Sequence, residues 1–144
     1  MSEKPNFDKA EMLARELRLM QPTDDFRLEI DSITFDRDIY IDTFENYALQ
    51  TNCPISRLTA DGTKKDGYTI ERGDTRIILY YENHRYEPRT KWTIVHEIGH
   101  IYMGHKSDAP IEEIEAHWFA AEFLMPTPII TAIALSGKKC TLKV

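Results

Sequence analysis

The residues best suited to chemistry form one short run, His96-Glu97-Ile98-Gly99-His100. Two histidines at positions i and i+4 project from the same face of a helix, one turn apart. Both imidazoles could therefore bind one tetrahedral zinc ion, at about 2.0–2.1 Å each. Glu97 lies about 100° around the helix from His96, so it would reach a water molecule at the metal rather than the metal itself. The pattern predicts a hydrolytic zinc centre with Glu97 as its general base.

The helix that must carry these residues is predicted from about Thr90 to Met103, between Pro88 and Gly104. Its histidine side also carries apolar and small residues, so this face is expected to be buried. Buried imidazoles need polar partners, because an unpaired polar group in the interior costs free energy. Two ordinary core histidines with hydrogen-bond partners are the alternative interpretation.

A second helix, predicted from about Ile111 to Met125, supplies carboxylates for the third ligand that a catalytic zinc needs. Glu113 is the predicted ligand, because it shares a face with small and apolar residues that are expected to pack inward. Glu115 lies on a different side of this helix and is the alternative ligand. The oxyanion of the reaction has three candidate partners, between which spacing does not choose: His84, Tyr102 and His105.

The two helices together resemble the ImmA/IrrE family of metallopeptidases. The first block is the HExxH run, and the second, Glu-x-Glu-Ala-x-x-Phe-Ala-Ala-x-x-Leu-Met-Pro, spans Glu113 to Pro126. The resemblance implies an α+β, zincin-like core in which a small three-stranded sheet packs on helices. It also implies the glutamate-ligand class of zincins, with a polar residue four positions after the ligand. That favours Glu113 and places His117 where the family usually has Asn or Asp, so His117 is expected to hydrogen-bond to a ligand or to touch the metal.

The resemblance also implies what the protein does. Members of the family cleave helix-turn-helix repressors of phages and mobile elements, so we expect a zinc-dependent endopeptidase with Zn²⁺ as cofactor and a DNA-binding repressor as partner. The alternative function is a non-proteolytic zinc-binding module that controls a transcription regulator by binding it. Direct nucleic-acid contact is not expected, because the net charge is −6 and no basic stripe is present.

The length of 144 residues suits one domain with its own core. We expect N-terminal helices over about 8–52, the zincin-like core over about 54–126 and a tail over 127–144. Family chains often continue past the Leu-Met-Pro block, so a chain that stops at Val144 would be a truncated or a minimal member. With no secretory signal, no apolar run long enough for a membrane span, and two cysteines read as reduced thiols, a cytoplasmic location is expected.

The other elements are predicted from periodicity and turn residues. Asp8 and Glu11 resemble a capping box that starts a helix ending near Met20. An irregular segment follows, and a helical face begins at Tyr40 and ends at Asn52. Three strands are predicted, over 55–59, 68–71 and 76–81, with a hairpin turn between the last two. The apolar run 76–81 favours a central strand, and an edge strand that pairs with substrate is the alternative.

Overall fold

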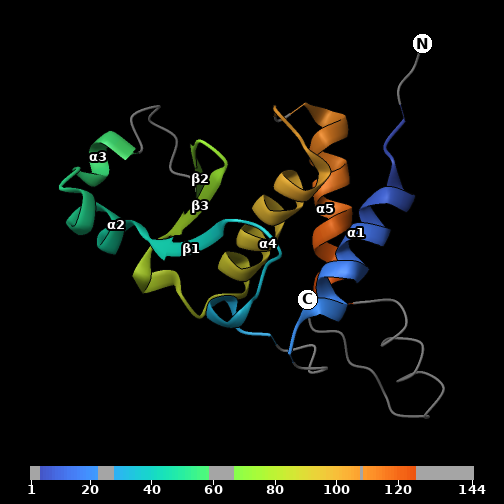
Figure 1. The fold of residues 1–144 in the computed structure, drawn as a ribbon, viewed down its shortest axis with the longest axis horizontal. Helices are drawn as coiled ribbons and strands as arrows, with labels where there is room; N and C mark the ends of the chain where they lie inside the picture. The colour runs from blue at the N-terminus through green and yellow to red at the C-terminus, as the bar shows by residue number, and fades with distance from the viewer. Residues whose placement is uncertain (1–3, 23–27, 59–66, 108, 126–144) are drawn as a thin grey trace.

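The computed structural model describes residues 4–22, 28–58, 67–107 and 109–125, in which three longer helices pack side by side next to a small sheet and two short helices lie beyond it (Figure 1). The fold is α+β, as predicted from the sequence. In chain order the helices and strands are α1 (Phe7–Met20), β1 (Ile39–Thr43), α2 (Phe44–Thr51), α3 (Ile55–Leu58), β2 (Gly67–Arg72), β3 (Thr75–Tyr80), α4 (Pro88–Met103) and α5 (Pro110–Leu124). Two short 3₁₀ turns, η1 (Ile30–Ser32) and η2 (Glu82–His84), precede β1 and α4.

The sheet has the strand order β1-β3-β2, with β1 parallel and β2 antiparallel to β3. The predicted hairpin is confirmed: β2 and β3 are joined by a tight turn in which Gly73 has a φ of 60°, a backbone conformation that glycine adopts without strain. The central strand is β3, and its residues Ile78, Leu79 and Tyr80 are almost completely buried. The apolar run of this strand therefore reflects burial in the core.

Three local predictions were wrong. Tyr40 lies in β1 and not in a helix, because Ile39–Thr43 pairs in parallel with β3 and the helix begins only at Phe44. The predicted strand at 55–59 is the short helix α3 over its described residues, and β1 takes the third place in the sheet. The first helix is capped by the side chain of Asn6, which accepts from the Lys9 N–H, and not by Asp8.

The helices pack with α5 between α4 and α1, as Figure 1 shows. Their shared core is made of fully buried apolar side chains: Ala10, Ala14, Leu17, Ile94, Val95, Ile98, Phe119 and Phe123. Helix α1 thus packs in the same helical layer as α4 and α5, and strand β1 belongs to the same sheet as β2 and β3. The predicted tail, residues 127–144, lies outside the described residues. None of the helices in the described ranges is long and apolar enough to cross a membrane.

Two glycines allow the elements around α4 to approach closely. A Cβ atom at Gly99 would lie 3.1 Å from two atoms of the Phe119 side chain and 3.2 Å from the Ala116 carbonyl oxygen on α5. At Gly67, the first residue of β2, a Cβ atom would lie 2.9 Å from Cγ2 of Thr93. Helix α4 therefore contacts α5 on one side and β2 on the other with almost no intervening side chain.

Candidate metal centre

Helix α4 carries the two histidines of the HExxH run on its partly enclosed face. Pro88 occupies its first turn, and Gly104 ends it with a φ of 73°, as the predicted stop requires. The rings of His96 and His100 lie edge to face, with centroids 4.6 Å apart. Both side chains are largely buried, with 14% and 11% of their surface exposed. Two imidazoles thus face one shared site, as their spacing predicts.

Glu113, on the first turn of α5, reaches both of these rings. Its Oε1 lies 2.9 Å from His100 Nε2, and its Oε2 lies 3.2 Å from His96 Nε2. Helix α5 begins with Pro110 in its first turn, and the Glu113 N–H donates to the Ala109 carbonyl oxygen. The close α4–α5 contact therefore places this carboxylate, predicted as the third ligand, between the two histidines.

The surroundings of His96 favour a neutral ring whose Nε2 lone pair is available to a metal ion. Burial lowers the pKa of His96 to about 4, and the nearby His100 and His117 add to this effect. The Nε2 atom of His96 is buried and, within the described residues, makes no hydrogen bond of acceptable geometry despite its proximity to Glu113. A buried, neutral imidazole nitrogen without a hydrogen bond, beside a second imidazole and a carboxylate, is a donor set that suits zinc.

His117 lies on the open side of the same site. Its Nε2 is 3.8 Å from Glu113 Oε2, and its ring centroid is 4.7 Å from that of His96. The ligand atoms of His96, Glu113 and His117 all lie within 4.8 Å of one another. His117 is 57% exposed at its side chain, whereas His100 is buried and held on both ring nitrogens. We therefore regard His96, His100 and Glu113 as the more enclosed set, with His117 able to add a fourth donor.

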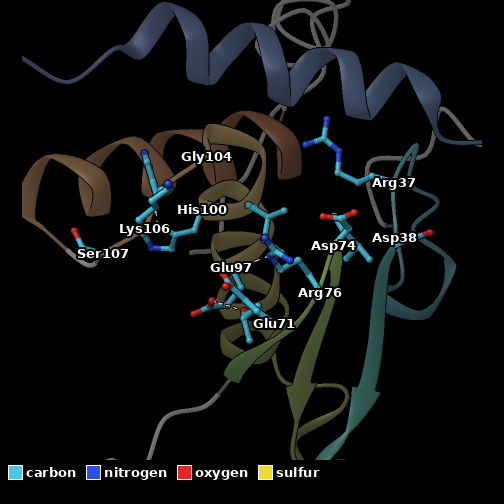
Figure 2. Close-up of a pocket in the computed structure, with 14 residues that line it drawn as sticks. Arg37, Asp38, Glu71, Asp74, Arg76, Glu97, His100, Gly104, Lys106 and Ser107 are labelled. Atoms are coloured by element: carbon cyan, nitrogen blue, oxygen red, sulfur yellow. Dashed lines mark hydrogen bonds and ion pairs between the residues drawn. The ribbon is translucent and has the colours of Figure 1, made fainter.

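Glu97 lines a cavity that also reaches His100 of this donor set. The Thr69 hydroxyl on β2 donates a 2.6 Å hydrogen bond to Glu97 Oε2. The cavity has a volume of about 800 Å³ and is lined by Glu97, His100 and Thr69 at one end. Figure 2 shows Glu97 and His100 on α4, with Glu71 and Arg76 reaching toward them from the sheet. The general base predicted from the sequence is thus held by a strand at the wall of a substrate-sized space.

Glu115, the alternative ligand, has different partners. Its carboxylate accepts from His105 Nε2 at 2.7 Å and from the Asn6 backbone N–H at 2.7 Å. His105 Nδ1 in turn lies 2.8 Å from His100 Nδ1. The sequence did not predict this arrangement, because it suggested His105 only as an oxyanion partner. The available signal was Gly104, whose left-handed backbone turns the chain back so that the His105 N–H donates to the His100 carbonyl oxygen.

The other two oxyanion candidates do not line the cavity. The Tyr102 hydroxyl donates to Asp36 Oδ1 at 2.8 Å. His84 lies in η2, where its ring packs against Tyr81. His105 does line the cavity, so it is the one candidate of the three that stays near the site.

Comparison with known proteins agrees with this geometry. The peptidase M78 family model, described as the IrrE N-terminal-like domain, matches residues 48–141. The chain belongs to this family. The ImmA/IrrE resemblance found in the sequence is thereby confirmed, and the family is one of peptidases that typically depend on a metal. The matched range of this M78 domain contains α4 and α5 but neither α1 nor β1. No curated protein and no solved structure matches the chain.

Proposed function

We propose that this M78 domain is a zinc-dependent endopeptidase that hydrolyses a peptide bond in a protein substrate. One observation carries the proposal: the Glu113 carboxylate lies between the Nε2 atoms of both HExxH histidines, while Glu97 faces the adjacent cavity. His96, His100 and Glu113 would hold the zinc, and the ligand atom of His117 lies within 4.8 Å of those of His96 and Glu113. Membership in a peptidase family supports the same reaction class.

The chain's own residues account for the proton transfers. When bound, zinc would act as a Lewis acid toward the peptide carbonyl and would make water more acidic. The Glu97 carboxylate takes the proton from the attacking water and then delivers it to the leaving nitrogen. Thr69 holds one oxygen of that carboxylate, which fixes the direction in which the base points. The low pKa of His96 keeps its ring neutral, so that its Nε2 lone pair remains a ligand near neutral pH.

The sheet provides a place for an extended peptide. Within the described residues, β2 is an edge strand whose other side pairs with β3. Thr69 and Glu71 of β2 both line the cavity that contains Glu97. An extended segment that adds to this edge by backbone hydrogen bonds would pass directly beside the general base. This supports an endopeptidase that takes an unfolded or loop segment of its substrate.

The partner that we propose is a helix-turn-helix repressor, and this part rests on the family resemblance alone. The test is to incubate the zinc-loaded protein with any helix-turn-helix repressor encoded near its gene and to locate any cut by mass spectrometry. We expect Glu97→Gln to keep its zinc and to lose activity by roughly 10²–10⁴-fold, the usual contribution of a positioned base. Glu16→Gln, the same change at an exposed position of α1, is the matched control.

Two results would count against the proposal. Glu97→Gln cleaving as fast as the wild type would refute the role of the general base. A repressor that binds tightly but is never cut would favour the alternative, a zinc-binding regulatory module that acts without proteolysis.

A further inference from the structure

A chain of short hydrogen bonds leads from His100 to the start of α1. His100 Nδ1 and His105 Nδ1 are 2.8 Å apart, and His105 Nε2 lies 2.7 Å from Glu115 Oε1. The second oxygen of Glu115 accepts from the Asn6 N–H at 2.7 Å. The His105 and Glu115 side chains are only 6% and 11% exposed. Groups so well enclosed lose their hydration, so these bonds are strong and geometrically demanding.

The position of each proton in this series of hydrogen bonds follows from the role of His100. If His100 Nε2 offers its lone pair to a metal, the neutral ring carries its proton on Nδ1. That N–H must then donate to His105 Nδ1, which places the proton of His105 on Nε2. The Nε2–H donates to a carboxylate oxygen of Glu115, so every donor in this hydrogen-bond network meets one acceptor. The opposite direction would need a proton on His100 Nε2, which would abolish its use as a ligand.

We propose that His105 and Glu115 are positioning residues for the metal ligand His100, which hold its ring orientation and its tautomer. The inference rests on the proposed zinc site. It assigns to His105 the task that a carboxylate or carbonyl usually performs beside a metal-bound histidine, with Glu115 one step further out. The last link, the Asn6 N–H, comes from the N-cap of α1, outside the residues matched by the family model. The start of the N-terminal helix is thereby connected to the proposed metal centre through Glu115, His105 and His100.

Zinc affinity, measured by competition with a chromophoric chelator, tests this without any protease assay. His105→Phe keeps the ring's bulk but offers His100 no acceptor, and we expect a loss of affinity of roughly 10–100-fold. His105→Gln keeps one acceptor and one donor, so it should recover part of that loss. Glu115→Gln should fall between the wild type and His105→Phe, while Glu16→Gln, the same charge change at an exposed site, should match the wild type.

The tautomers give a second readout that needs no variant. In the zinc-loaded wild type, ¹⁵N NMR of the imidazole nitrogens should show His100 protonated on Nδ1 and His105 protonated on Nε2 only. His105 protonated on Nδ1, or His105→Phe with the zinc affinity of the wild type, would overturn the inference while the zinc site itself stands. A wild-type protein that binds no zinc would instead refute the proposed function, and this inference with it.

Discussion

Gly99→Ala tests whether the close contact between α4 and α5 positions the proposed metal ligands. The added Cβ would lie 3.1 Å from Cβ and Cδ1 of Phe119 and 3.2 Å from the Ala116 carbonyl oxygen. One of these neighbours is backbone and the other is a fully buried ring, so neither can move aside without shifting α5. Overpacking of this kind costs about 1–3 kcal/mol.

A gain in helix propensity opposes that cost. Alanine stabilises a helix interior by about 0.5–1 kcal/mol relative to glycine. The difference leaves a net destabilisation of roughly 1 kcal/mol, or about 2–4 °C in Tm for a domain of nearly this size. Because Glu113 lies on α5 and both histidines lie on α4, the same displacement should weaken zinc binding.

The assay is urea unfolding of the metal-free protein with EDTA present, so that zinc binding does not contribute to the stability. Zinc affinity is then measured separately. In the double variant Gly99→Ala/Phe119→Leu the ring is absent, so its destabilisation should be less than the sum of the two single changes. A Gly99→Ala protein that is more stable than the wild type and binds zinc equally well would refute the reasoning. Helix propensity alone would then account for the effect of the substitution.

Three further predictions concern other parts of the molecule. Thr69→Val removes the hydrogen bond to Glu97, the proposed general base. We expect kcat to fall about 10-fold or more with zinc content unchanged, since a hydrogen bond to a charged group contributes about 1.5–3 kcal/mol. An unchanged kcat would show that the bond does not orient the base. Gln21→Leu leaves three backbone groups, one buried and two partly buried, without the partners that this amide supplies at 2.8–3.0 Å. Urea unfolding should show a loss of about 2–4 kcal/mol, because a fully buried group left unpaired costs about 1–3 kcal/mol and the two partly buried groups cost less. A loss below about 1 kcal/mol would contradict this. Burial raises the pKa of both Tyr80 and Tyr102 to about 12 from near 10. The stability linked to these shifts is therefore fully present below pH 10 and is lost as pH rises toward 12. Near-ultraviolet titration should show two tyrosines that ionise only near pH 12, and Tyr102→Phe should remove one of them.

The local elements of the site were predictable because they depend on short-range geometry. The 3.6-residue period places His96 and His100 on one face of a helix wherever that helix lies in the fold. Gly104 stops the helix because glycine adopts the left-handed conformation required there. The β2–β3 hairpin followed from its turn residues in the same way. These features need only the residues next to them, and they appear where the sequence predicts them.

The strand β1 could not be inferred in this way. Tyr40 and Phe44 fit a helical period, but Ile39–Thr43 extends because β3 offers it a parallel partner. That partner is more than thirty residues away in the sequence, at Arg76–Tyr80. Pairing with a distant strand overrides a weak local preference, since β-structure depends on context more than helices do. The third strand of the sheet therefore came from a segment other than the one predicted.

The sequence by itself determined which residue types stand one helical turn apart on α4 and that α5 carries carboxylates. Only the tertiary structure decided which carboxylate meets which histidine. The rotation of α5 against α4, set by the Gly99–Phe119 contact, brings Glu113 to His96 and His100. The same rotation directs Glu115 to His105 and to the start of α1. Two glutamates two residues apart point to different sides of one helix, and only the packing of neighbouring elements gives each side its partner.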